Sequence, residues 1–258
     1  MRAIRVSVAE SKKELLANLR MRCKSFKERE GYPIMGGDRE VTMEMDPYDA
    51  LDRTRHFNAY EGGKMIGASR IVLPIAEATG ERYGLPHERK FTVCPSRPGL
   101  RGRRGEVGRV CVDRSYQNRK VHSRVCHTMC EVSLREDVSV WVSSANLDTD
   151  SEEEADIMYK LLDQRGSIHH DIETVIKTSE RPSGHPRFLF FRDCHERTRA
   201  RLGKASRLPR AVSADERVGV MFIGSPYWEP ELGTFVQPLI AEVRHVLANL
   251  TGSRRKNS

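Results

Sequence analysis

The first clear hydrophobic pattern lies near the start of the chain. Apolar side chains recur at helical spacing over residues 15–26, and Ser11 with Glu14 forms the capping box that begins a helix. Residues 54–60 and 64–73 are two strand-like runs joined by a turn that contains two glycines. This pattern predicts a long helix followed by a β-hairpin.

The middle of the chain alternates between strand-like and helical patterns. We expect strands at residues 106–113, 138–145 and 168–177, and helices at residues 119–135 and 150–165. Residues 74–105 are rich in proline, glycine and arginine, which predicts a long excursion over the surface. The pattern weakens after residue 178, where we expect a strand at 187–191, a helix at 193–202, a strand at 217–223 and an amphipathic helix at 235–250.

The order of these elements indicates the fold class. Helix, hairpin, strand, helix, strand, helix and strand together predict an α/β fold with a mixed central sheet flanked by helices. The strands at 106–113 and 138–145 and the helix between them form a βαβ unit. We expect a main domain at residues 1–178, a C-terminal extension at 179–251 packed on it, and a disordered tail at 252–258.

Composition favours a cytoplasmic protein. No stretch approaches the roughly 18 apolar residues that a membrane span needs, and the first residues do not resemble a signal peptide. The six cysteines show no pattern of paired spacings, so we expect them to be reduced.

One predicted helix carries three side chains of the kind that bind metal ions. His122, Cys126 and Cys130 recur every four residues. The first and last of them would lie about 12 Å apart along the helix axis, too far to share one ion. We therefore expect no metal site.

The chain is moderately basic, with a formal net charge of +8. This charge suits an acidic protein partner, an anionic substrate or nucleic acid. Nucleic-acid binding has little support, because aromatic residues make up only 7% of the chain and are not interleaved with the basic ones. A basic nucleic-acid-binding or regulatory protein, with its contacts at residues 97–104 and 254–256, stays open as an alternative.

Charged residues interrupt several of the predicted apolar elements, and they carry the strongest functional signal. Arg22, Arg70, Glu106 and Arg109 lie in these elements, and Asp46 and Asp49 lie in the predicted loop between the helix and the hairpin. A charge inside an apolar strand is costly unless it is paired. We therefore expect these side chains to form one cluster, and clusters of this kind are often functional sites.

The same positions carry a resemblance to a known family. The resemblance is to the signature of the acyl-homoserine-lactone synthases and of their relatives, the bacterial long-chain N-acyl amino acid synthases. It rests on Arg22-x-x-x-Phe26, Tyr32, Asp46 with Asp49, Arg70 and Glu106-x-x-Arg109, and it covers roughly residues 15–145. It implies an N-acetyltransferase-like (GNAT-like) fold and a fatty acyl group taken from acyl carrier protein.

Two departures favour the N-acyl amino acid synthases within this group. Tyr32 stands where the lactone synthases usually have tryptophan. The loop between Leu73 and Glu106 and the segment after Lys177 are longer than a minimal synthase needs. A lactone synthase that uses S-adenosylmethionine remains an alternative, as do the acyltransferases found beside exosortase sorting systems.

The resemblance and the chemistry of amide formation together suggest roles for individual residues. We expect Glu106 beside Arg109 to be the general base, and the backbone N–H groups of Val110 and Val112 to stabilise the oxyanion. The expected acceptor-binding residues are Arg22, Phe26, Tyr32, Asp46, Asp49 and Arg70. The expected acyl-chain pocket consists of Val138, Val140, Trp141 and Val142. Apolar residues in such a strand are also typical of plain core.

The stretch after Asp113 bears on the acyl donor. Members of this fold that use acetyl coenzyme A typically have a glycine-rich turn there, because backbone N–H groups approach the pyrophosphate closely. Residues 114–124 contain no glycine. We therefore expect the phosphopantetheine thioester of acyl carrier protein as donor substrate, and no bound cofactor. The acidic carrier surface would face Arg103, Arg104, Arg119, Lys120 and Arg124.

Overall fold

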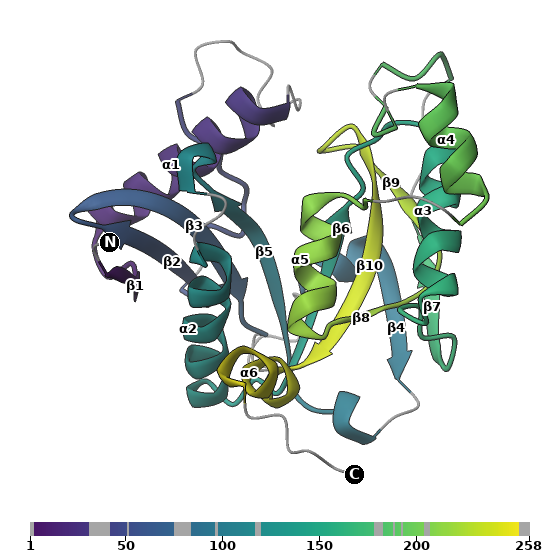
Figure 1. Cartoon of the computed structure of the whole chain (residues 1–258). Coiled ribbons are helices and arrows are strands. Elements are labelled where there is room, and N and C mark those ends of the chain that lie inside the picture. The colour runs from purple at the N-terminus through teal and green to yellow at the C-terminus, as the bar shows by residue number, and fades with distance from the viewer. Residues whose placement is uncertain are drawn as a thin grey trace.

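The strands of the computed structural model form one large sheet and one small sheet (Figure 1). The structure describes residues 3–30, 42–50, 52–74, 84–95, 98–116, 120–177, 183–187, 189–191, 193–203 and 207–252. Within these residues the large sheet has eight strands in the order β1-β2-β3-β5-β6-β10-β8, with β9 paired to β10. Strands β4 and β7 form the small sheet.

The strands are β1 (Ile4–Val8), β2 (Thr54–Glu61), β3 (Lys64–Val72), β4 (Phe91–Pro95), β5 (Arg104–Val112), β6 (Val140–Asn146), β7 (Ile172–Ile176), β8 (Met221–Phe222), β9 (Tyr227–Glu229) and β10 (Thr234–Glu242). The helices are α1 (Lys12–Glu30), α2 (Val121–Arg135), α3 (Glu152–Gln164), α4 (Cys194–Arg201), α5 (Arg210–Val218) and α6 (Val243–Thr251). Short 3-10 turns are η1 (Pro86–Arg89), η2 (Pro98–Leu100) and η3 (Arg114–Tyr116). No helix of the described ranges combines the length and the apolar character needed to span a membrane.

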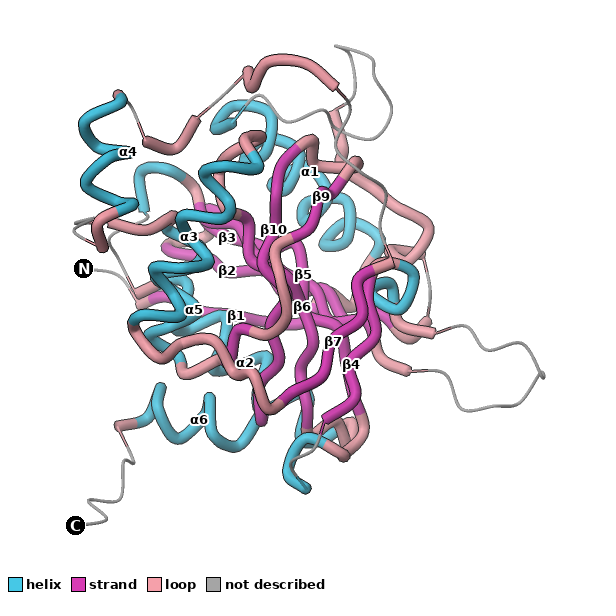
Figure 2. Tube along the Cα trace, turned by 90° about the vertical axis from the view of Figure 1, so that its right-hand side faces the viewer, coloured by secondary structure: helices cyan, strands magenta, loops and turns pink. Residues whose placement is uncertain are grey.

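Different elements cover the two faces of the large sheet. Gly67 of β3 lies close to Val121 of α2, whereas the next residue, Ala68, packs against Met21 of α1. Because successive strand residues point to opposite faces, α1 and α2 lie on opposite sides of the sheet. On the α1 side, Phe91 of β4 packs on β6, so the small sheet covers that half of the face (Figure 2).

Strands β5 and β6 diverge in the centre of the sheet. They are parallel, and they pair only between residues 104–106 and 140–142. Beyond Glu106, β5 stays paired with β3 while β6 pairs with β10, and Figure 1 shows the two strands spreading apart. A bulge in β5 increases the bend, and there Arg109 adopts a φ of 55°. The backbones of β5 and β6 therefore separate beyond Glu106, toward Val112, and we call this separation of the two strands the opening.

Most of the elements predicted before residue 178 are confirmed. Helices α1, α2 and α3, the hairpin β2–β3 and strands β5, β6 and β7 match the predicted segments within a few residues. Residues 74–105 differ from the predicted surface excursion, because they contain β4 and place Leu85, Phe91 and Leu100 in the core. The sequence pattern also does not predict β1.

The C-terminal segment differs most from its prediction. Residues 234–242, predicted as the first half of a helix, form β10, and only Val243–Thr251 is helical. Because β10 pairs with β6 inside the large sheet, segment 179–251 supplies part of that sheet rather than a layer packed on it. Helix α5 ends at Val218, so the strand predicted at 217–223 shrinks to β8. The described residues of 187–191 contain no strand. Of the predicted tail, residues 253–258 lie outside the described residues.

Candidate active site

Three arginines from three different elements bind the carboxylates of the segment before β2. Arg22 of α1 donates twice to Asp49, from Nη1 to Oδ1 at 2.6 Å and from Nη2 to Oδ2 at 3.0 Å. Arg70 of β3 donates twice to Asp46, at 2.7 and 2.6 Å, and its Nη1 also donates to Asp49 at 2.7 Å. Arg109 of β5 donates from Nη2 to Asp46 at 3.1 Å. These contacts tie α1, β3 and β5 to one segment.

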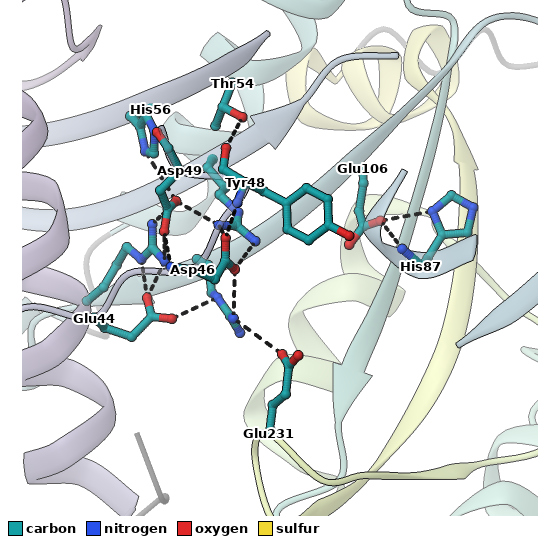
Figure 3. Close-up of polar contacts among 12 residues, drawn as sticks. Glu44, Asp46, Tyr48, Asp49, Thr54, His56, His87, Glu106 and Glu231 are labelled. Carbon is teal, nitrogen blue, oxygen red and sulfur yellow. Dashed lines mark hydrogen bonds and ion pairs between the residues drawn. The ribbon is translucent and has the colours of Figure 1, made fainter. Parts of the chain in front are cut away.

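Glu44 belongs to the same group, although the sequence analysis does not select it (Figure 3). Its carboxylate pairs with Arg22 and lies 3.1 Å from Nε of Arg109. A signal is present in the sequence, because Glu44 and Asp46 alternate with two methionines, and alternate residues of an extended segment point to the same side. We call Arg22, Glu44, Asp46, Asp49, Arg70 and Arg109 the arginine–carboxylate cluster.

The electrostatics of this cluster keep its aspartates ionised. Burial acts to raise the pKa of Asp46, but the hydrogen bonds and charge of Arg70 outweigh it and hold the pKa well below its usual value. Burial opposes ionisation of Asp49 as well, and its pKa is nevertheless lowered by the hydrogen bond from Arg22 and the charge of Arg70. Burial also acts to lower the pKa of Arg70, and Asp46 reverses this effect, so that the pKa is raised.

The balance of charge leaves Arg22 and Arg70 little capacity to bind a further anion. Three guanidinium groups face three carboxylates, and these two arginines are 0% and 5% exposed. Arg109, whose side chain is 14% exposed, lies at the edge of the cluster. The structure thus brings together most of the predicted acceptor-binding residues, but it arranges them as an internal clamp.

The two aromatic residues expected beside them do not complete an acceptor pocket in the described part of the chain. Phe26 is partly buried and packs against Met21, Ala68 and Cys111 under α1. Tyr32 lies outside the described residues. The position of Phe26 is that of a core residue of this layer.

Glu106 lies apart from the cluster, and its carboxylate binds His87 (Figure 3). Its Oε2 accepts the backbone N–H of His87 at 2.5 Å and lies 2.9 Å from Nδ1 of the ring. His87 is buried in η1, whereas the side chain of Glu106 is 18% exposed. The contact fixes this carboxylate at the last position where β5 pairs with β6, at the start of the opening. Nothing in the sequence selects His87, because it lies in a segment without periodicity.

The turn between β9 and β10 reaches across the opening from the β6 side. Glu231 in this turn lies 3.8 Å from Arg109 on β5 (Figure 3). It also lies 3.6 Å from Lys90 beside η1. Lys90 also pairs with Glu229, which is buried. These ion pairs connect the two sides of the opening.

The backbone N–H groups of Val110 and Val112 point away from β3. Cys111 pairs with Ala68 of β3, and the N–H of Asp113 donates to Ile66 at 2.8 Å. Because the N–H groups of successive strand residues point to opposite sides, those of Val110 and Val112 point away from β3 and into the opening.

The four residues expected in an acyl-chain pocket divide between the two faces of the sheet. Val140 and Val142 pack with Phe91 on the face that also carries Glu106, because Glu106 and Val142 are register partners. Val138 and Trp141 belong to the core under α2. One pocket therefore does not contain all four residues, and Val138 and Trp141 have the surroundings of plain core.

The basic residues expected to face a carrier protein divide into two groups. Arg103 and Arg104 lie at the start of β5, where Arg103 donates to the backbone oxygen of Glu136 just after α2. Lys120 and Arg124 lie at the other end of α2, about 22 Å away by the helix rise. Arg119 lies outside the described residues. The structure therefore does not place these residues in a single patch.

His122 and Cys126 lie on neighbouring turns of α2, with Nε2 3.7 Å from Sγ. Burial and the charge of Arg217 lower the pKa of His122 to about 4, and burial raises the pKa of Cys126. Within the described ranges, no group of three or more histidine, cysteine, aspartate or glutamate side chains is placed to hold a metal ion.

Comparisons with known proteins identify the family. A model of the N-acyl amino acid synthase FeeM family matches residues 17–149, just over half of the chain. No curated protein matches the sequence. Among solved structures, the chain is similar to FeeM, an N-acyl amino acid synthase from uncultured soil microbes, with a TM-score of 0.54 and 11% identity over 95% of this chain and 94% of FeeM.

The chain is similar to two further solved structures, BjaI and TofI, with TM-scores close to that for FeeM. BjaI, a coenzyme A-dependent acyl-homoserine lactone synthase solved with S-adenosylmethionine and isopentyl-CoA, has a TM-score of 0.52 and 15% identity over 98% of this chain and 89% of BjaI. TofI, solved with an inhibitor and MTA, has a TM-score of 0.50 and 14% identity over 97% of each chain.

At these identities the solved structures show the fold, and they confirm the predicted GNAT-like sheet flanked by helices. The family match covers the arginine–carboxylate cluster, Glu106 and the opening between β5 and β6. The chain therefore belongs to the FeeM family of N-acyl amino acid synthases, and so to the amide-forming acyltransferases.

Proposed function

We propose that this enzyme moves a long-chain fatty acyl group from acyl carrier protein to the α-amine of an amino acid. The observation that carries the proposal is the position of Glu106, which His87 holds where β5 and β6 separate. A carboxylate at this point can take a proton from an amine that attacks a thioester held between the strands. Membership of the FeeM family supports an amino acid as acceptor.

The proposed reaction forms a C–N bond and breaks the C–S bond of the thioester. A neutral amine attacks the carbonyl carbon, and Glu106 accepts the proton that the nitrogen loses, directly or through a water molecule. The departing thiolate then takes up this proton, which regenerates the carboxylate. The N–H groups of Val110 and Val112 point into the opening and are suited to stabilise the oxyanion.

His87 acts as a positioning residue in this scheme. Both of its donors bind Oε2 of Glu106, which leaves Oε1 to face the amine. Hydrogen bonds to an ionised carboxylate are about twice as strong as neutral ones, so the contact restricts rotation of the side chain.

The choice of acyl carrier protein over coenzyme A rests on the sequence after β5. Residues 114–124 contain no glycine, and bulky side chains there hinder a close backbone approach to a diphosphate. BjaI shows that a similar fold can use coenzyme A, so both donors belong in the assay.

The experiment that tests this function is detection of the N-acyl product by mass spectrometry. The protein is incubated with long-chain acyl carrier protein or the matching acyl-coenzyme A, and with the standard amino acids. We expect an N-acyl amino acid from the carrier-linked donor, and its loss in Glu106→Gln. Glu131→Gln, an exposed glutamate of α2, is the matched control and should keep full activity. Product from coenzyme A alone, or unchanged product in Glu106→Gln, would contradict the proposal.

A second candidate function is an acyl-homoserine lactone synthase that uses S-adenosylmethionine as acceptor. The similarity of the fold to BjaI, solved with S-adenosylmethionine, favours it. The same assay with S-adenosylmethionine in place of the amino acids separates the two functions, because only the second yields an acyl-homoserine lactone.

A further inference from the structure

A basic cavity, whose wall includes the His87 that binds Glu106, takes no part in the reaction proposed above. It has a volume of about 480 Å³ and lies between η1, β4, the start of β5 and the end of β7. Its walls include Tyr48, His87, Arg89, Arg104 and Lys177. Another cavity, of about 520 Å³, lies between α3 and α4, away from these residues.

The charge of the cavity favours an anionic group. Arg89, Arg104 and Lys177 face a single acidic wall residue, Glu88. Lys177 donates to the backbone oxygen of Glu88 at 3.0 Å, and Arg89 lies over the ring of Tyr48. In the described part of the chain, no carboxylate pairs with Arg89 or Arg104. The cavity thus contrasts with the arginine–carboxylate cluster, where internal acids already neutralise the arginines.

A wall residue of the cavity also carries an unsatisfied polar atom. Nε2 of His87 is buried, and it has no hydrogen-bond partner among the described residues. Buried polar atoms in native proteins nearly always have a partner, so an atom of this kind indicates a bound ligand or water. The other ring nitrogen of His87 binds Glu106, which links the cavity wall directly to the proposed base.

Arg104 and Glu106 are placed to bind the two ends of one small molecule. They are two residues apart on β5 and share the face that carries Val140 and Val142, their register partners on β6. The Cα atoms of residues at this spacing are about 7 Å apart along a strand. An amino acid whose amine contacts Glu106 and whose carboxylate contacts Arg104 fits this separation, given two hydrogen bonds of about 2.8 Å.

We infer that this cavity binds the carboxylate of the acceptor, so that Arg104 and Glu106 hold an amino acid by its two charged ends. The inference rests on the proposed function and deepens it. Arg104 then binds the acceptor carboxylate in place of Arg22 and Arg70, because Asp46 and Asp49 already occupy the guanidinium groups of these two arginines. The inference also takes Arg104 from the predicted carrier surface into the acceptor site, with Arg89 and Lys177 contributing positive charge.

The test compares amino acids with their carboxamides in wild type and in Arg104→Gln. The probes are L-leucine with L-leucinamide and L-tyrosine with L-tyrosinamide, each with the long-chain acyl carrier protein. We expect wild type to prefer the acid over the amide by about 10- to 100-fold in kcat/KM, the range for a hydrogen bond between charged groups. In Arg104→Gln this preference should fall to about 1, through a higher KM for the acid.

Arg103→Gln is the matched control, since the adjacent Arg103 donates to the backbone oxygens of Glu136 and Pro74 and is not a wall residue of the cavity. It should keep the acid preference. If Arg104→Gln instead raises the KM for the donor, the anion is the phosphate of phosphopantetheine and the inference is wrong. A preference that survives in Arg104→Gln overturns it as well.

Calorimetric titration of the four probes without donor separates this inference from the proposed function. Tighter binding of the acids than of the amides, lost in Arg104→Gln, supports the carboxylate site even if no acyl product forms. Equal binding of acid and amide in wild type overturns the inference, even if the enzyme acylates both.

Discussion

Two contacts with His87 hold the carboxylate of Glu106 in one orientation. The backbone N–H and Nδ1 of His87 lie 2.5 and 2.9 Å from the same oxygen of Glu106. The pair lies at the point where β5 leaves β6, so that a rotation of this carboxylate would move it out of the opening. Precise placement of a general base affects the rate of the chemical step more than it affects substrate binding.

Substitution of His87 should separate orientation of Glu106 from proton transfer by the imidazole. The side-chain amide of His87→Asn can donate from about the position of Nδ1, so this variant should keep most of the wild-type kcat. His87→Leu removes the donor, and we expect kcat to fall about 10- to 100-fold with little change in KM for the donor. If His87 itself carries the proton, His87→Asn will lose as much activity as His87→Leu, and its pH–rate profile will lose a limb. Steady-state kinetics across pH distinguish the two results.

At the scale of elements, the arginine–carboxylate cluster replaces ordinary apolar packing between α1, the segment before β2, β3 and β5. Arg70 is the central member, since it binds both Asp46 and Asp49. Removing one partner of a buried ion pair leaves the other charge unpaired, which typically costs about 3–5 kcal/mol. The cluster is therefore a stability element next to the site.

The substitution Arg70→Met should lower the free energy of unfolding at pH 7 by about 3–5 kcal/mol, because two buried carboxylates lose their shared partner. Arg207→Met is a matched control, since Arg207 forms a partly exposed pair with Glu196, and such pairs contribute about 0–1 kcal/mol. Urea unfolding measures both. Equal losses in the two variants would show that the cluster does not stabilise the fold.

The same cluster should make the free energy of unfolding depend on pH below about pH 4. The pKa values of Asp46 and Asp49 are lowered in the folded state, against about 3.9 in an unfolded chain. Folding therefore gains stability from them above pH 4, and this gain is lost as the pH falls below 4 toward the folded-state pKa values. The difference in stability between wild type and Arg70→Met should shrink over this range. Urea titrations from pH 7 to pH 2 that show a constant difference would contradict the assignment.

Sequence patterns predict some of these elements and sites well, and the failures have physical reasons. Charges in apolar strands predict the cluster, because burial demands partners. β10 is buried on both faces, so it lacks the alternation of a half-exposed strand and resembles a helix segment. Pro238 argues against the helix predicted at 235–250, since proline disrupts the interior of a helix. His87 is beyond prediction, because only the tertiary fold brings η1 to β5.

At the scale of the whole molecule, exposed basic residues lie near both ends of the opening between β5 and β6, with Arg103 at one end and Lys120 and Arg124 at the other. The opening is closed at Glu106, near Arg103 and Arg104, and it widens toward Val112. The chain continues from there through η3 to the start of α2, where Lys120 and Arg124 are exposed. A phosphopantetheine arm that enters the opening from its wide end would bring a carrier protein next to Lys120 and Arg124.

Charge reversal at Lys120 and Arg124, near the start of α2, should therefore have an effect that charge reversal at Arg103 does not have. The double variant Lys120→Glu with Arg124→Glu should raise the KM for the acyl carrier protein about tenfold or more, because like charges would then face an acidic carrier. Its KM for the matching acyl-coenzyme A should change much less, and its dependence on salt should weaken. Arg103→Glu, at the closed end of the opening, is the control and should leave both values unchanged. Equal effects of the two variants on the carrier-linked donor would place the docking surface elsewhere, and a rise in KM with Arg103→Glu alone would place it at the start of β5.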